Sequence, residues 1–133
     1  MKTDLKHGSL TDKILRVFYD VYNELGYGFL ESVYHRSFVL ALDSVGLNVC
    51  SRVAIPVWFR GHQVGHFEAD ILVERCVLLE LKAVRVLDWS HRAQLLNYLR
   101  ATDIEVGLLL NFGERPEFKR LIFDNLKKKT RNP

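Results

Sequence analysis

The segment VLLELKAV, residues 77–84, has the composition of a buried β-strand, yet it contains a glutamate and a lysine. Because side chains alternate between the two faces of a strand, Glu80 and Lys82 point to the same face. Burying a charged group costs free energy unless the group is paired or bound to a metal. Glu80 and Lys82 therefore either lie at a solvated edge of a sheet or belong to a functional site.

The composition of the chain is that of one soluble globular domain. Its 133 residues suffice for a hydrophobic core, with 48% hydrophobic and 26% charged residues. No run of about 18 apolar residues predicts a membrane span, and the first ten residues lack the apolar centre of a signal peptide, so we expect a cytoplasmic protein. Cys50 and Cys76 are too few for a zinc site or a disulfide framework, and we expect both to be reduced core residues.

The charge pattern permits a polyanionic partner without requiring one. The net charge is +3 and the pI is near 9.0. The densest basic run, residues 126–131, falls in a C-terminal tail at 126–133 that we interpret as solvated. No linker or repeat divides the chain, so we expect one domain over residues 1–133 with its core at about 10–124. A Gly-rich phosphate loop and a G-x-S-x-G motif are both absent, which argues against NTPases, kinases and serine hydrolases.

Two helices are predicted in the N-terminal third. Residues 9–26 carry apolar side chains at helical spacing, and Gly26 and Gly28 interrupt the pattern. A second helix is predicted over residues 30–45, with Gly46 as its stop. The side chains expected on its inward face are Leu30, Val33, Ser37, Phe38, Ala41 and Val45.

The rest of the chain has the pattern of a sheet with one further helix. An antiparallel meander of three strands is predicted at 49–59, 63–73 and 76–84, and Pro56 indicates an edge or a bulge. A third helix follows at 88–102, with Asp88 or Ser90 as its N-cap. Residues 105–113 predict a strand buried on both faces, and residues 118–123 are a candidate final edge strand. The predicted fold class is α/β, a single domain with a mixed β-sheet flanked by helices in the order α-α-β-β-β-α-β.

Asp70 lies in the strand that precedes the opening segment. If Asp70 opposes Glu80 in an antiparallel pair, their Cβ atoms lie roughly 4.5–5.5 Å apart, and the turn between the strands is centred on Arg75. Two carboxylates at this distance repel, so one is protonated or a cation lies between them. A divalent ion with metal–oxygen distances of about 2.1 Å would bridge the pair. Lys82 would stand about 7 Å further along the same face.

Asp70, followed ten residues later by Glu80-Leu81-Lys82, resembles the core motif of the PD-(D/E)xK nuclease superfamily. The segment GFLESVY, with Gly28, Glu31 and Tyr34, is similar to the G-x-x-E-x-x-Y signature of the GxxExxY family within that superfamily. The segment AQLLNYL, with Gln94 and Tyr98, is similar to the Q-x-x-x-Y helix that follows E-x-K in related nucleases. The resemblance extends from about Leu10 to Gly113 and implies a restriction-endonuclease-like core.

The resemblance also implies a metal site. Asp70 and Glu80 would bind Mg²⁺ or Mn²⁺ with help from the backbone carbonyl of Leu81. Glu31 would complete the acidic cluster directly or through a water. Lys82 would polarise the attacking water and offset charge on the scissile phosphate.

Further residues are expected around this centre. Gln94 and Tyr98 lie one helical turn apart on one face, where they would shape the catalytic site or contact the nucleic-acid backbone. Arg52 and Arg85 are candidates for substrate binding. We therefore interpret the protein as a metal-dependent endonuclease acting on DNA rather than RNA, and we expect a homodimer because one core cuts one strand.

Two other interpretations remain open at the level of the sequence. In the first, the chain is a non-catalytic nuclease-like module that binds nucleic acid or a partner protein. In the second, it is a structural homodimer that associates through exposed apolar residues near Trp58. Glu80 and Lys82 would then form a solvated ion pair, and Asp70 would pair with Arg52 or Arg75.

Overall fold

The computed structural model of the protein describes residues 6–128 and contains one five-stranded mixed sheet. The strands lie in the order β1 (Val49–Phe59), β2 (His62–Val73), β3 (Val77–Lys82), β4 (Val106–Phe112) and β5 (Pro116–Ile122). All neighbouring strands are antiparallel except β3 and β4, which are parallel. The predicted fold class is confirmed, and the candidate final strand is formed as β5.

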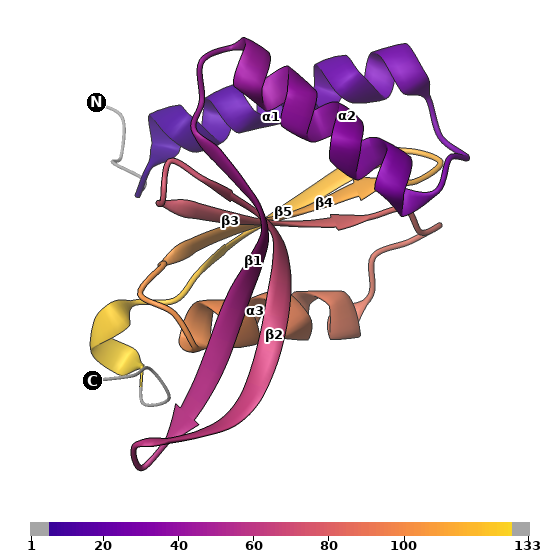
Figure 1. The fold of residues 1–133 in the computed structure, drawn as a ribbon. Helices are drawn as coiled ribbons and strands as arrows, with labels where there is room; N and C mark the ends of the chain where they lie inside the picture. Colours follow the sequence, from indigo (N-terminus) through magenta and orange to yellow (C-terminus); the bar gives the residue numbers. More distant parts are fainter. Residues whose placement is uncertain (1–5, 129–133) are drawn as a thin grey trace, which may run out of the picture.

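Helices cover both faces of the sheet (Figure 1). One face packs against α1 (Gly8–Leu25) and α2 (Glu31–Ser44), and the other packs against α3 (Trp89–Arg100). Helix α3 joins the parallel strands β3 and β4, as a crossover connection requires. Leu79 and Leu81 of β3 belong to the core under α1 and α2, whereas Leu78 belongs to the core under α3. Alternation along the strand therefore turns Glu80 toward the side of α3.

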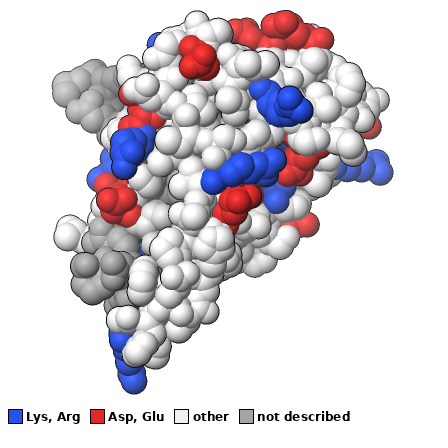
Figure 2. Space-filling model, in the orientation of Figure 1, with Lys and Arg blue, Asp and Glu red and all other residues white. Residues whose placement is uncertain are grey.

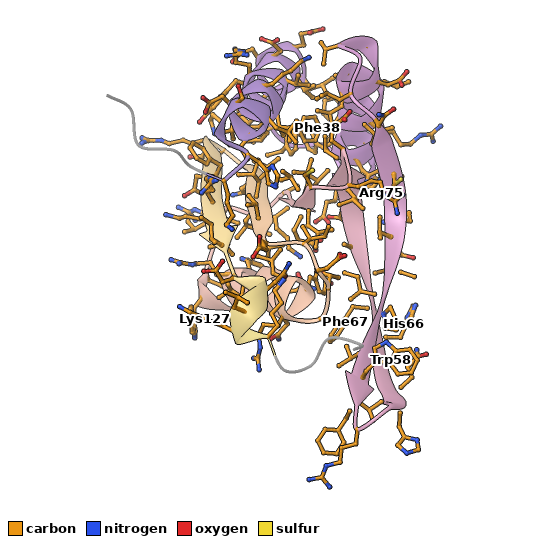
Figure 3. All side chains as sticks on the ribbon, turned by 90° about the vertical axis from the view of Figure 1, so that its left-hand side faces the viewer. Phe38, Trp58, His66, Phe67, Arg75 and Lys127 are labelled. Carbon is orange, nitrogen blue, oxygen red and sulfur yellow. The ribbon has the colours of Figure 1, made fainter. Side chains whose placement is uncertain are left out.

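The hairpin of β1 and β2 runs well beyond the sheet. The two strands pair from Val49 and Val73 to Phe59 and His62, but β2 pairs with β3 only from Ile71 onward. The distal part of the hairpin consequently projects from the body of the protein (Figure 3). Strand β1 is an edge strand, which agrees with the predicted position of Pro56.

The turn between β2 and β3 sets the register of the two strands. Ile71 pairs with Leu79 and Val73 pairs with Val77, which is the predicted register. Glu74 and Arg75 both have positive φ, 52° and 56°, as at the central positions of a type I′ turn. The sequence contains neither Gly nor Asn there. Instead, Asn48 N–H donates to the Glu74 carboxylate at 2.6 Å and Glu74 N–H donates to the Asn48 carbonyl at 2.9 Å.

The inward face predicted for the second helix is correct in its middle and wrong at its ends, because Phe38 is buried and Ala41 packs against the core as predicted. Leu30 is 77% exposed and Val45 is also exposed, whereas the buried side chains of α2 are Tyr34, His35, Phe38 and Leu42. Tyr34 and His35 carry polar atoms that find hydrogen-bond partners inside the protein. A search for apolar periodicity does not detect such residues, and this rotates the expected face away from the observed one.

Other expectations fall on the surface of the domain. Cys50 is exposed rather than in the core, because it lies on the edge strand β1, and Cys76 is half-buried; both are free. In the basic tail, residues 129–133 lie outside the described residues, whereas Lys128 Nζ donates to the carbonyls of Thr102 and Ile104. No helix in the part of the chain that the structure describes is long and apolar enough to cross a membrane.

Asn111 of β4 continues the connection between β3 and β4 after β3 ends. Its fully buried side chain accepts from Val84 N–H at 3.0 Å and donates to the Val84 carbonyl at 2.8 Å. Gly113 lies against the same segment, and a Cβ atom at this position would stand 2.2 Å from the Val84 carbonyl oxygen. The backbone at Val84 and Gly113 therefore approaches too closely for any side chain at position 113.

We predict that Gly113→Ala lowers the free energy of unfolding by about 1–3 kcal/mol, the usual cost of overpacking. The matched control is Gly65→Ala, because a Cβ atom at that position meets only Val57 at 3.6 Å, an ordinary contact. Urea denaturation of both variants checks the prediction. Equal stabilities for the two variants would contradict it.

Candidate active site

The acidic residues meet where β2 separates from β3. Leu81 N–H donates to Asp70 Oδ2 at 2.7 Å, and Asp70 N–H donates to Glu80 Oε1 at 3.3 Å. The Asp70 carboxylate thus takes the place of a backbone carbonyl of β2 as the partner of Leu81 N–H. The structure brings Asp70 and Glu80 together, and backbone donors fix both side chains.

The carbonyl of Leu81 faces the same place. In an extended strand, the N–H and C=O groups of one residue point toward the same neighbouring strand. Since Leu81 N–H donates to Asp70, its carbonyl oxygen is also directed toward β2. Two carboxylates and one backbone carbonyl therefore converge at this junction.

Glu80 is a buried acid with incomplete charge compensation. Its side chain is 5% exposed, and Lys82 Nζ lies 3.8 Å from Glu80 Oε2. Burial and, to a smaller extent, the Asp70 carboxylate together raise the pKa of Glu80 to about 8, against the opposing effect of Lys82. Lys82 therefore does not fully offset the free-energy cost of ionising Glu80 at this buried position.

Arg52 approaches the pair from β1. Its Nη1 atom lies 4.0 Å from both Glu68 Oε1 and Asp70 Oδ1. The backbone of Arg52 has φ of 60°, a left-handed conformation that is uncommon for a residue other than glycine within a strand. Strained backbone of this kind persists where the surrounding structure imposes it, commonly at functional sites. The ion pair of Asp70 with Arg52 coexists with the contact between Asp70 and Glu80.

Glu31 is the first residue of α2, where the positive end of the helix dipole favours a carboxylate. Burial raises the pKa of Glu31, whereas Lys82 and a hydrogen bond from the Ala83 N–H lower it. A hollow of about 210 Å³, named here the acidic hollow, separates α2 from the strands. Its lining residues are Glu31, Ser32, His35, Arg52, Asp70 and Leu81.

The two other residues of the G-x-x-E-x-x-Y segment shape the backbone that leads to Glu31. Gly28 has φ of 111°, a conformation that favours glycine. Tyr34 is fully buried, and its hydroxyl donates to the Gly26 carbonyl at 2.7 Å and accepts from Phe29 N–H at 3.2 Å. The Tyr34 ring stacks on Phe112 with centroids 4.5 Å apart. Tyr34 therefore holds the loop that fixes where α2 begins.

Gln94 and Tyr98 of α3 lie on the other side of the acids. Burial, with smaller contributions from the Glu80 and Asp70 carboxylates, raises the pKa of Tyr98 to about 12, although a hydrogen bond with Gln94 acts in the opposite direction. The Tyr98 ring also packs on Phe67 of β2 with centroids 5.4 Å apart. These two residues form the α3 wall of the site.

Sequence reasoning missed His35 and Ser51. His35 Nε2 lies 2.6 Å from Ser51 Oγ, and His35 lines the acidic hollow. Burial and the nearby Arg52 lower the pKa of His35, so its imidazole is held neutral. His35 follows Glu31 by four residues, which places both on one face of the helix. This spacing could have indicated that His35 lies near the site. Arg85, by contrast, lines a different hollow, formed with segments 27–29 and 112–114.

Comparison with known families gives this geometry its context. A family model described as the PD-(D/E)XK nuclease superfamily matches residues 8–121. The chain belongs to the PD-(D/E)XK nuclease superfamily. No curated protein matches it. Among solved structures, the crystal structure of SSO0001 is similar, with a TM-score of 0.57 and 19% identity, which supports the fold alone. The alignment covers 89% of this chain and 60% of that one, so this chain spans less than two thirds of that protein.

Nucleases of this superfamily generally use divalent metals, and the donor set here fits a hard cation. Two carboxylate side chains and the Leu81 carbonyl are the oxygen ligands that Mg²⁺ and Mn²⁺ accept. Across residues 6–128, no three His, Cys, Asp or Glu side chains already converge as a complete metal site. Asp70 and Glu80, with the Leu81 carbonyl, are the residues that would hold such an ion.

We predict that Glu80 makes the stability of the metal-free protein depend on pH. The pKa of Glu80 rises from 4.5 to about 8 on folding, so the folded protein binds this proton more tightly than the unfolded chain does. The resulting stabilisation is full below about pH 4.5 and is lost as the pH rises through about 8. Glu80→Gln cannot ionise, so its free energy of unfolding should fall less over this range than that of the parent.

Urea denaturation in the presence of a chelator, at several pH values between about 5 and 9, measures this difference. Glu24→Gln is the matched control, because Glu24 is an exposed residue of α1. This control should show the same pH dependence as the parent. Identical pH dependence for Glu80→Gln and the parent would show that Glu80 is not the group responsible.

Proposed function

We propose that the protein is a Mg²⁺- or Mn²⁺-dependent nuclease of the GxxExxY kind that hydrolyses phosphodiester bonds in nucleic acid, DNA rather than RNA. The observation that supports this proposal most strongly is the buried contact of Glu80 with both Asp70 and Lys82. A purely structural scaffold has no physical need to hold two acids and a lysine together away from water.

Each residue of the cluster has a chemical task in this proposal. Asp70, Glu80 and the Leu81 carbonyl hold the ion, which when bound supplies Lewis acidity toward the phosphate. Lys82 has three N–H donors, so it can contact Glu80 and a phosphate oxygen or water at the same time. Glu31, at the start of α2, orients a water at the rim of the acidic hollow.

A non-catalytic module that binds nucleic acid or a partner protein is the second candidate. The absence, within residues 6–128, of three side chains already arranged as metal ligands favours it. The modest net charge of +3 also gives little electrostatic affinity for a duplex. In this case the acids would influence stability and would have no role in cleavage.

We predict that three substitutions separate binding of the metal from catalysis. Glu80→Gln removes a charge from the ligand pair, so both affinity for Mn²⁺ and cleavage should fall. Lys82→Ala removes no ligand, so Mn²⁺ should still bind while the cleavage rate falls by roughly 10²-fold or more, the scale for losing a positioned catalytic group. Glu31→Gln should have an intermediate effect. Calorimetric titration of Mn²⁺ and nicking of plasmid DNA measure the two properties.

Lys119→Ala is the matched control, since Lys119 is exposed on β5 at the edge of the sheet. It should leave both properties unchanged. The parent protein should be tested with Mg²⁺ and with Mn²⁺ on single-stranded, duplex and branched substrates. If it cuts none of them, the enzyme proposal is abandoned in favour of the binding module.

We further propose that two copies act together, because one domain holds one cluster and a two-fold dimer addresses both strands of a duplex. Sedimentation equilibrium of the purified protein should then give twice the mass of 15.5 kDa. A monomer at micromolar concentration and above would contradict the dimer and leave the cleavage proposal unaffected.

A further inference from the structure

A second hollow, of about 310 Å³, adjoins the acidic cluster. Its walls are the loop between α1 and α2, the segment after β3 and the turn between β4 and β5, at residues 27–29, 83–85 and 112–114. These three segments meet at the right-hand end of the sheet in Figure 1. Its size is at the lower end of the range for small-molecule pockets, which suits a single ring system.

Side chains that are buried (Asn111, Tyr34) or half-buried (Tyr22) hold all three walls in place. Asn111 binds both backbone groups of Val84, and the Tyr22 hydroxyl lies 2.7 Å from the carbonyl oxygens of Gly113 and Glu114. The third wall, the loop between α1 and α2, is held by the Tyr34 hydroxyl, which accepts a hydrogen bond from Phe29 N–H. The hollow is thus a preformed feature of the fold.

Two aromatic side chains at this hollow are exposed to solvent. Tyr27 is 61% exposed and Phe29 is 49% exposed. Phe29 contacts the buried Tyr34 ring in an edge-to-face arrangement, with centroids 6.0 Å apart. Arg85, also exposed, stands on the opposite wall. Aromatic rings and guanidinium planes are the groups on which proteins stack unpaired nucleobases.

The second hollow and the acidic hollow lie along neighbouring parts of the same two segments, because Phe29 and Ala83 line the second hollow and Glu31 and Leu81 line the acidic hollow. Glu31 lines the acidic hollow and accepts a hydrogen bond from the N–H of Ala83, which lines the second hollow. Lys82 directly precedes Ala83 in the chain. A nucleotide whose phosphate lies at Lys82 therefore has the second hollow beside it.

We propose that this hollow is a base pocket, which receives one unpaired nucleobase next to the phosphate bound at the acidic cluster. A base within a stacked duplex cannot enter a pocket of this size, so the preferred substrate is single-stranded or has a flipped-out nucleotide. Tyr27 and Phe29 stack on the base, and Arg85 contacts it or the adjoining phosphate. This inference deepens the nuclease function proposed above and rests on it.

The test measures binding without metal, by fluorescence anisotropy, to a short single-stranded DNA and to a strand of the same length made of abasic residues. The parent should bind the base-containing strand roughly tenfold more tightly or better, because base–aromatic stacking contributes on this scale. Tyr27→Ala and Phe29→Ala should lose most of this preference and bind the abasic strand like the parent. Phe29→Tyr, which keeps the ring, should restore the preference.

Phe59→Ala is the matched control, because Phe59 is 56% exposed at the end of β1, near the tip of the projecting hairpin. It should keep the preference of the parent. Tyr27→Ala keeps the test valid if Phe29→Ala fails to fold, since Tyr27 is the more exposed of the two rings and its removal disturbs packing less. An unchanged preference in both alanine variants overturns the base pocket, as does a parent that binds both strands equally.

The readout also separates the two proposals. A parent that prefers the base-containing strand but cleaves nothing with Mg²⁺ or Mn²⁺ disproves the nuclease function and leaves the pocket as the binding site of a module. A parent that cleaves DNA but binds both strands equally disproves the base pocket alone.

Discussion

Asp70 accepts a hydrogen bond from Leu81 N–H at the point where β2 stops pairing with β3. The Asp70 side chain thereby does what a backbone carbonyl of β2 would otherwise do, and the geometry of the site follows from this exchange. The carboxylates of Asp70 and Glu80 accept from Leu81 N–H and Asp70 N–H, so these two backbone donors stay paired where β2 separates from β3. The departure of β2 opens space beside β3. That space is the acidic hollow, where Arg52, Glu31 and Asp70 meet.

The pairing of Asp70 with Glu80 was predictable because it depends only on the register of two strands joined by a short turn. A hairpin with its turn centred on Arg75 places Asp70 beside Glu80, and alternation along one strand places Lys82 on the same face. The face of α2 was not predictable from apolar spacing, because Tyr34 and His35 are buried with polar partners. The separation of Arg85 from the acids depends on distant contacts, since Asn111 holds the segment that follows β3.

The G-x-x-E-x-x-Y segment combines three different physical requirements in seven residues. Gly28 supplies a backbone conformation, Tyr34 supplies a buried hydrogen-bonding anchor, and Glu31 supplies the charge that faces the strands. Because the anchor also binds the loop before α2, the position of Glu31 is tied to the packing of Phe112 in β4. The G-x-x-E-x-x-Y pattern therefore corresponds to one rigid structural unit, in which Gly28 and Tyr34 fix the position of Glu31, rather than to three independent functional groups.

The outer edge of β1 pairs with no other strand within residues 6–128, and such edges invite strand addition and aggregation. Three features interrupt this edge: the left-handed backbone at Arg52, the missing N–H of Pro56 and the irregularity between Val57 and Trp58. In the view of Figure 2 the projecting hairpin shows little charge apart from a basic side chain at its tip, so charge repulsion gives this edge little protection. The backbone distortion that brings Arg52 to Asp70 therefore also protects the protein against edge-to-edge polymerisation.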